Sequence, residues 1–206
     1  MFKKGLMAAA MICMLSMATV MCAQAEEAQT ETEAAETTEA AGEAEAAASG
    51  QAEFTWDENL QQMFINDGFA GTIFDIDALG MEILVPEGME ERQPTDEEKA
   101  QDTILVFENT ETEQKIELVL GEVGECKTLD EVKAYIEENV PGIVITPTRI
   151  NEYDTLVYGS EETNSMCVLI GAGDAGFLRV ICRPIDTPEM NSLFSYVAAS
   201  IQQIKD

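Results

Sequence analysis

The sequence predicts an α+β domain in which helices flank a mainly antiparallel β-sheet. Three observations lead to this fold class. Eight short segments between residues 71 and 183 have the composition or the apolar–polar alternation of strands. Most neighbouring segments are joined by connections of hairpin length, which link antiparallel strands. Three longer segments carry an apolar stripe at helical spacing, so each is expected to cover the sheet with one face.

The domain is predicted to begin with a helix over residues 55–66. Thr55 and Glu58 have the spacing of a capping box, in which two side chains satisfy backbone N–H groups of the first turn. One face of this helix is apolar and is expected to pack on the domain; it carries Trp56, Leu60, Met63 and Phe64. Residues 66–68, Asn-Asp-Gly, end the helix.

The first four strands are predicted at residues 71–77, 81–85, 103–108 and 115–120. Residues 103–108 are apolar on both faces, as expected of a central strand. The third and fourth strands form a hairpin through residues 109–114. Residues 90–102 are mostly acidic or polar and are predicted to form a loop.

The second half of the domain repeats this pattern of helix and strands. A helix is predicted over residues 128–139, with a second capping box at Thr128 and Glu131. Four strands follow at residues 143–151, 153–159, 165–170 and 177–183, and Pro147 marks the first as an edge strand or a bulged one. A final helix over residues 187–205, with Thr187 as N-cap and Pro188 in the first turn, is expected to lie across the sheet.

Residues 1–25 are predicted to be a secretory signal peptide. Lys3 and Lys4 precede an uncharged, mostly apolar run, and residues 23–25 have the small-x-small pattern of a signal-peptidase site. We predict cleavage after Ala25. The form of the signal indicates a bacterial protein that is exported by the general secretory route and is extracellular or at the cell surface. Two alternatives stay open: a lipid anchor on Cys22, and a retained apolar helix.

Residues 26–52 are predicted to be a disordered acidic linker rich in Glu, Ala and Thr. The segment holds eight Glu and no basic residue, and it lacks the apolar side chains that would offset the entropy of ordering. Self-repulsion between the carboxylates should extend it. Residues 53–206 then form a single domain.

Charge and composition exclude several functions. The net charge is −29, and residues 53–206 retain nine of the 11 basic and 32 of the 40 acidic residues, a net charge of about −23. Such a surface does not bind nucleic acid and favours a soluble monomer. The chain has no His, which excludes Ser-His-Asp and Cys-His catalysis and His-containing zinc sites.

Part of the chain resembles a known family. Residues 81–89, Met-Glu-Ile-Leu-Val-Pro-Glu-Gly-Met, are similar to the strand and Pro-x-Gly-aromatic start of PsbP-like domains, although Met89 stands where Trp is usual. The resemblance covers about residues 79–204 and includes the helix after residues 128–131 and the last helix. It implies an α/β/α sandwich around an antiparallel sheet. Members are mostly non-enzymatic binding or assembly factors, among them a Ran-binding import factor, so no catalytic residue carries over.

Three cysteines remain after signal cleavage, an odd number that gives no complete disulfide framework. Cys167 and Cys182 lie on the two strands of the last hairpin, so a disulfide between them is one hypothesis. If the turn is centred on residues 173–174, however, Cys167 faces Val180, and two small buried thiols are the alternative. Cys126 precedes the second helix, and a reactive thiol activated by the helix dipole is the less favoured alternative there.

Acidic residues offer only unspecific metal or catalytic sites. Asp75 and Asp77 share a strand face, and residues 96–98 form an acidic run. Such oxygen clusters suit Ca²⁺, but the sequence lacks an Asp-x-Asp-x-Asp-Gly loop. We expect these carboxylates to be solvated surface, and no cofactor is expected.

The sequence therefore indicates an exported, non-catalytic binding or assembly module whose partner is a protein or peptide, one with a cationic surface suiting the domain charge. Its sheet face, or the segment of residues 90–102, would be the contact surface. A carboxylate-based hydrolase and a Ca²⁺-dependent surface protein are the alternatives. Contact with a membrane is expected only through an N-terminal anchor.

Overall fold

The structure is a computed structural model that describes residues 51–204. The predicted signal peptide, with the cleavage site at Ala25 and the alternative lipid site at Cys22, lies outside the described residues. The same holds for the predicted linker up to residue 50. Among the described residues, no helix is long and apolar enough to cross a membrane.

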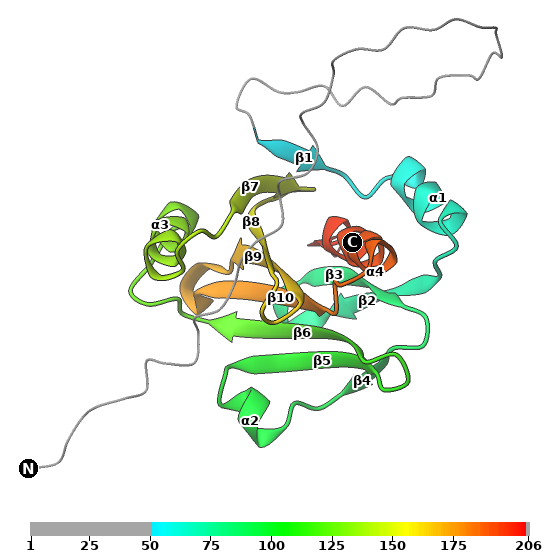
Figure 1. The fold of residues 1–206 in the computed structure, drawn as a ribbon, viewed down its shortest axis with the longest axis horizontal. Coiled ribbons are helices and arrows are strands. Elements are labelled where there is room, and N and C mark those ends of the chain that lie inside the picture. The colour runs from blue at the N-terminus through cyan, green and yellow to red at the C-terminus, as the bar shows by residue number, and fades with distance from the viewer. Residues whose placement is uncertain (1–50, 205–206) are drawn as a thin grey trace, which may run out of the picture.

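An eight-stranded sheet forms the centre of the domain (Figure 1). Its strands, in spatial order, are β1 (Ala52–Phe54), β7 (Ile145–Ile150), β8 (Tyr153–Ser160), β9 (Ser165–Gly171), β10 (Phe177–Arg183), β6 (Gln114–Gly121), β5 (Thr103–Asn109) and β4 (Glu90–Arg92). All neighbours are antiparallel except β1, which runs parallel to β7. The predicted α+β class and mainly antiparallel sheet are confirmed.

A second, three-stranded sheet lies against the first. It consists of β11 (Gln202–Gln203), β3 (Met81–Pro86) and β2 (Gly71–Ile76), in that order. Phe74 of β2 packs edge-on against Phe107 of β5, with ring centroids 4.9 Å apart. The sequence predicted β2 and β3 as strands but not their separation from the main sheet.

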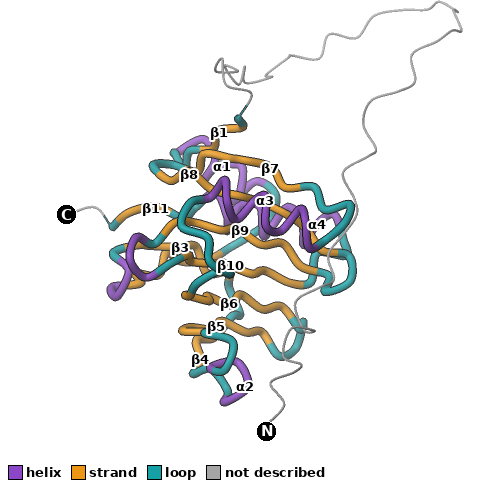
Figure 2. The backbone as a smooth tube through the Cα atoms, turned by 90° about the vertical axis from the view of Figure 1, so that its left-hand side faces the viewer, coloured by secondary structure: helices purple, strands orange, loops and turns teal. Residues whose placement is uncertain are grey.

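Four helices complete the domain: α1 (Glu58–Asn66), α2 (Asp96–Lys99), α3 (Leu129–Asn139) and α4 (Pro188–Ala199). In Figures 1 and 2, α3 lies on one face of the main sheet, and α4 with the small sheet lies on the other. Each face therefore has its own apolar cluster, one under α3 and a larger one under α4 and the small sheet. The structure differs from the expected α/β/α sandwich in one layer, because that layer contains the small sheet as well as α4.

Helix capping follows the predictions at α3 and α4 but not at α1. Thr128 and Glu131 form the capping box of α3, and Thr187 accepts a hydrogen bond from the Met190 N–H group at the start of α4. The N-cap of α1 is Asp57, whose carboxylate accepts from the Leu60 N–H group at 2.9 Å, so the predicted capping box at Thr55 is wrong. The reason is tertiary, since the Trp56 N–H group donates to the Asn151 side chain, and a tight turn in which the Asp57 N–H group donates to the Thr55 carbonyl at 3.0 Å precedes the helix.

The segment of residues 90–102 was predicted to be a loop, which is wrong. It contains the short edge strand β4 and the one-turn helix α2, which begins with a capping box formed by Thr95 and Glu98. A three-residue strand and a four-residue helix are too short to show a hydrophobic period.

The last helix ends at Ala199, before the predicted end at residue 205. Ser200 Oγ accepts a hydrogen bond from the Leu84 N–H group and donates one to the Val197 carbonyl, at 2.8 and 2.7 Å. This contact ties the end of α4 to β3, so the chain leaves the helix and continues as β11 beside β3. Pro147 lies in a part of β7 that β1 does not cover, as expected of an edge position.

Candidate functional site

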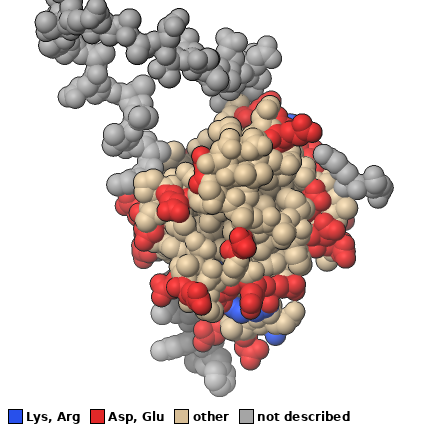
Figure 3. Space-filling model, turned by 90° about the vertical axis from the view of Figure 1, so that its right-hand side faces the viewer, with Lys and Arg blue, Asp and Glu red and all other residues tan. Residues whose placement is uncertain are grey.

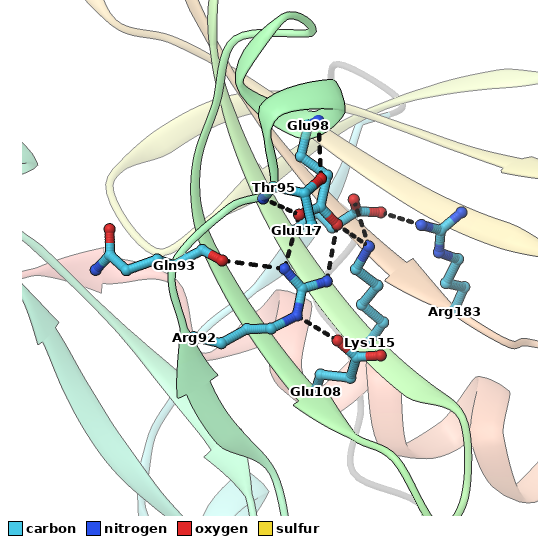
Figure 4. Close-up of polar contacts among 8 residues, drawn as sticks. All are labelled: Arg92, Gln93, Thr95, Glu98, Glu108, Lys115, Glu117 and Arg183. Carbon is cyan, nitrogen blue, oxygen red and sulfur yellow. Dashed lines mark hydrogen bonds and ion pairs between the residues drawn. The ribbon is translucent and has the colours of Figure 1, made fainter.

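A cluster of six charged side chains spans the open part of the main sheet (Figure 4). We call it the charged belt, and it consists of Arg92 on β4, Glu98 on α2, Glu108 on β5, Lys115 and Glu117 on β6, and Arg183 on β10. Its three carboxylates and three cations balance. The belt contains part of the segment of residues 90–102 that the sequence proposed as a contact surface.

The belt fastens α2 and β4 to the sheet. Glu98 accepts from both ends of the Arg92 guanidinium, at 2.7 and 2.8 Å, and from Lys115 at 2.5 Å. Arg92 also pairs with Glu108. The hydrogen bond from Arg92, together with Lys115 and the Thr95 N–H group, holds the pKa of Glu98 far below its usual range despite partial burial.

At the other end of the belt, the charges are also paired within the chain. Glu117, 8% exposed, accepts from Lys115 at 2.9 Å and from Arg183 at 2.6 Å. Every cation of the belt therefore faces a carboxylate of the same chain. Such an arrangement holds structure together, because each charge has a partner of opposite sign within the belt.

The structure does not bring Cys167 and Cys182 together. Both are buried free thiols, and Cys167 lies opposite Ile181 in the β9–β10 pair, one residue away from the predicted Val180. Alternation along the strands then places Cys182 with Val180 in the larger core, whereas Cys167 lies on the α3 face opposite Tyr158. The register differs because the hairpin tip contains a short 3₁₀ turn, Gly173–Ala175.

Burial suppresses the reactivity of these thiols. It raises the pKa of Cys167 to about 11, even though Tyr158 and the nearby Arg179 favour the thiolate. Burial likewise raises the pKa of Cys182. Cys126, which precedes α3, is a half-buried free thiol.

Carboxylates form no metal-binding group in the described part of the chain. No group of three or more His, Cys, Asp or Glu side chains in residues 51–204 is arranged to hold a metal ion. Asp75 lies on β2, while Asp77 begins the short 3₁₀ turn Asp77–Leu79, so the strand face they were predicted to share ends between them.

Two surface pockets also lack a pair of carboxylates. The first, of about 290 Å³, is lined by Thr55, Trp56, Asn151, Glu152 and Gln202. Its single carboxylate, Glu152, accepts a hydrogen bond from the Gln203 N–H group. The second, of about 270 Å³, lies between β1, β7 and α4 and has no acidic residue in its lining.

The surface formed by residues 59–74 is different in character, and we call it the α1–β2 segment. It carries one charged residue, Asp67, in a chain whose residues are 25% charged. Three of its large apolar side chains are well exposed: Met63 at 54%, Ile65 at 60% and Ile73 at 41%. The side of the molecule where α1 lies in Figure 1 faces the reader in Figure 3, and there a broad uncharged area is surrounded by Asp and Glu.

An aromatic cluster holds the α1–β2 segment in place. Phe64 and Phe69 contact each other and the Tyr196 ring of α4, with ring centroids 5.6–6.0 Å apart. The Tyr196 hydroxyl donates to the Asp67 carboxylate at 2.6 Å. The one charge of the segment therefore has a hydrogen-bond partner within the chain, although Asp67 is itself exposed.

The segment leads into β2, which is the longest open strand edge in residues 51–204. The edge strands of the two sheets are β1, β4, β11 and β2, with three, three, two and six residues. β2 has no Lys or Pro, the residues that commonly protect an edge from pairing with another chain. This surface was not predicted from the sequence, although the long interval with a single charge was a visible signal.

Comparisons with known proteins agree with the fold and add nothing on function. No protein-family model matches the chain, and no curated protein matches it. The chain is similar to cyanobacterial PsbP (CyanoP) from Synechocystis sp. PCC 6803, at 15% identity over 64% of this chain and 91% of that one, with a TM-score of 0.41. It is similar to the Ran-binding protein Mog1p of Saccharomyces cerevisiae, at 10% identity over 66% and 97%, with a TM-score of 0.42. The predicted resemblance to PsbP-like domains is thus confirmed, as one of fold alone.

Proposed function

We propose that this chain is an exported, non-catalytic binding or assembly module that docks a protein partner on the α1–β2 segment. The observation that carries the proposal is the contrast between this segment and the rest of the domain. An uncharged surface with Met63, Ile65 and Ile73 exposed is unusual in a domain whose net charge is about −23.

The arrangement of the segment suits a protein interface. Interfaces typically combine an apolar centre with a polar rim, and charged residues are depleted at the centre. Here the uncharged area is bordered by exposed carboxylates at the start of α1, Asp57 and Glu58, and at the end of β2, Asp75 and Asp77. The negative rim would steer a partner with a positive surface.

The remaining surfaces support this choice. The charged belt is neutralised within the chain, and the two surface pockets bring no carboxylates together. The proposal therefore gives the module no chemical step, and it places binding on the surface whose groups are not used internally.

Export is part of the proposal. Cleavage after Ala25 would release the domain as a monomer with an acidic segment of residues 26–52 at its N-terminus. In the lipid-anchored alternative, this segment would be a spacer between the membrane and the domain. The intact mass of the mature protein tests this, because a chain beginning at Glu26 is expected. A mass that includes diacylglycerol on Cys22 would replace secretion with lipid anchoring.

Site-specific photocrosslinking in the native cell envelope tests the docking surface. We expect p-benzoylphenylalanine at Ile65 or Ile73 to crosslink to a discrete partner. The matched control is Val144, an apolar residue of similar exposure, 54%, between α3 and β7. Equal crosslinking at Val144, or none at Ile65 and Ile73, would contradict the proposed function.

A further inference from the structure

The hydrogen-bonding pattern of β2 shows which backbone groups its open edge presents. The Glu87 N–H group donates to the Ala70 carbonyl at 2.8 Å, which identifies the opposed residues Gly71 and Pro86 as a non-hydrogen-bonded pair. Because such pairs alternate along an antiparallel ladder, Thr72, Phe74 and Ile76 bond to β3. The N–H and C=O groups of Gly71, Ile73 and Asp75 point away from β3.

The same alternation is visible on the far side of β3. Leu84, the partner of Ile73, turns its N–H group away from β2 and donates it to Ser200 Oγ at 2.8 Å. The outward groups of β3 are thus covered by α4 and β11. Those of β2 have no strand beside them in residues 51–204.

The side chains along this edge have their own pattern. Ile73 and Asp75 lie on the same face, with Ile73 exposed opposite Leu84 and Asp75 exposed directly opposite Glu82. Two carboxylates in a directly opposed pair repel each other. Neither Asp75 nor Glu82 forms an ion pair within the described residues; Glu82 accepts only an amide hydrogen bond, from Gln202 at 2.6 Å.

From this pattern we propose that the β2 edge binds an extended strand of a partner protein. In this strand an apolar residue and a Lys or Arg stand two positions apart, so that both side chains lie on the same face. The apolar side chain lies beside Ile73 and the cation lies beside Asp75, two residues along the same face. The outward backbone groups of Gly71, Ile73 and Asp75 bond to the strand, in the manner of strand addition to a free edge. This inference rests on the proposed function and names the chemistry of its partner.

Charge excludes the two occupants that the chain itself offers. The linker of residues 26–52 holds eight Glu and no basic residue, so it would add negative charge beside Asp75. A second copy paired through β2 would bring together two domains of about −23 each, with an Asp75 from each copy at the junction. A basic segment instead relieves the repulsion between Asp75 and Glu82.

A synthetic peptide tests the inference directly. The probe is a fluorescent peptide of about eight residues with the repeat Val-Thr-Lys-Thr, which places valine and lysine two residues apart on one face and is long enough to cover the six residues of β2. Its control has glutamate in place of each lysine. Fluorescence anisotropy with the full mature chain is expected to show binding of the lysine peptide only, weakening as salt is added.

Hydrogen exchange of the unaltered protein shows where the peptide binds. In the free chain the amides of Ile73 and Asp75 should exchange fast, and those of Thr72 and Phe74 slowly, because the latter bond to β3. Binding is expected to slow exchange at Ile73 and Asp75 at least tenfold and to leave Thr72 and Phe74 nearly unchanged.

Two substitutions separate backbone recognition from side-chain recognition. Ile73→Pro removes an outward N–H group without removing a bond to β3, and should weaken peptide binding about tenfold. Ile73→Val keeps the N–H group and should bind almost normally. Asp75→Asn should weaken binding about threefold and reduce the salt dependence, whereas its control Asp77→Asn should not.

The outcomes distinguish this inference from the proposed function. Peptide binding with unchanged exchange at Ile73 and Asp75, or binding insensitive to Ile73→Pro, overturns strand addition. Concentration-dependent dimers in which these two amides become protected would make a second copy the occupant, which also overturns it. Crosslinks from Ile65 and Ile73 in the native envelope would still support the proposed function in either case.

Discussion

Asn151 and Trp56 are 95 residues apart in the chain, and a hydrogen bond of 2.8 Å joins the Asn151 side-chain oxygen to the Trp56 N–H group. The side-chain nitrogen of Asn151 donates to the carbonyls of Ala199 and Ile201, at 3.0 and 2.7 Å. One residue in the β7–β8 turn therefore joins the approach to α1, the end of α4 and the chain leading to β11. It positions the N-terminal boundary of the α1–β2 segment.

The first prediction concerns this link. Asn151 has a φ of 50°, a left-handed conformation that Asn adopts more easily than most residues. Asn151→Ala should lower the free energy of unfolding by about 2–4 kcal/mol, since it removes three hydrogen bonds and adds backbone strain. Urea denaturation measures the change.

Asn151→Gly serves as the control, because Gly relieves the strain but restores none of the bonds. Its loss should be smaller than that of the Ala variant yet still above about 1 kcal/mol. A Gly variant as stable as the original protein would show that the side-chain bonds of Asn151 contribute nothing.

The second prediction concerns acid stability through the charged belt. Because ion pairing holds the pKa of Glu98 far below its unfolded value, its contribution is fully present above about pH 4.3 and decreases as pH falls below that. Glu98→Gln should cost about 1–2 kcal/mol at neutral pH and should show a smaller further loss between about pH 4 and pH 2. Denaturation at several pH values tests both effects.

Glu97→Gln is the matched control, since Glu97 is the exposed neighbour on the same turn of α2. It should leave stability within about 0.5 kcal/mol of the original. Equal effects at the two positions would mean that net charge, rather than the contacts of Glu98, sets acid stability.

The third prediction concerns Tyr196, which joins α4 to the α1–β2 segment. Burial, and then the hydrogen bond to Asp67, raises the pKa of Tyr196 to about 12. Its contribution is therefore present below about pH 10 and is lost as pH rises toward 12. Tyr196→Phe should cost about 1 kcal/mol at neutral pH and should remove part of the alkaline loss of stability.

Exposed Tyr135 provides the comparison, since 44% of it is open to solvent. Burial raises the pKa of Tyr158 further still, so late ionisation is not unique to Tyr196. Ultraviolet titration of Tyr196→Phe should lose the ionisation step near pH 12, and titration of Tyr135→Phe should keep that step. Loss of a step near pH 10 in Tyr196→Phe would show instead that the contact with Asp67 and burial do not act on Tyr196.

The fourth prediction concerns the thiols. In native protein, iodoacetamide should modify Cys126 much faster than Cys167 or Cys182, because both of the latter are buried and have raised pKa values. In denaturant the three should react at similar rates. Peptide mass spectrometry after timed quenching measures this order, and a peptide that links Cys167 to Cys182 would contradict the strand register.

Much of the secondary structure could be predicted because its cause is local. The capping box at Thr128 and the N-cap at Thr187 satisfy backbone groups within one turn, and they are present where expected. The alternation along β10 also holds, since period-2 burial is a property of the strand itself. In β6, by contrast, residues 116–119 are all buried, because other parts of the chain cover both of its faces.

The candidate site was harder to predict because it depends on relationships between distant segments. The loop proposed as a contact surface is held by Arg92, Lys115 and Glu98, which come from three elements. A capping box was expected at Thr55, but the Trp56 N–H group donates to the distant Asn151, and the helix begins only after Asp57. No local pattern could reveal that β2 would end as an open edge.

By itself, the sequence determined the α+β class, most strand and helix positions, the acidic character and the absence of histidine chemistry, because periodicity, capping and composition act within short stretches of chain. Only the tertiary structure decided that two sheets form rather than one, that Cys167 and Cys182 lie on opposite faces, and that Ile73 and Asp75 present free backbone groups. These features depend on which strands become neighbours and in what register, and that choice is made by packing between residues far apart in the chain.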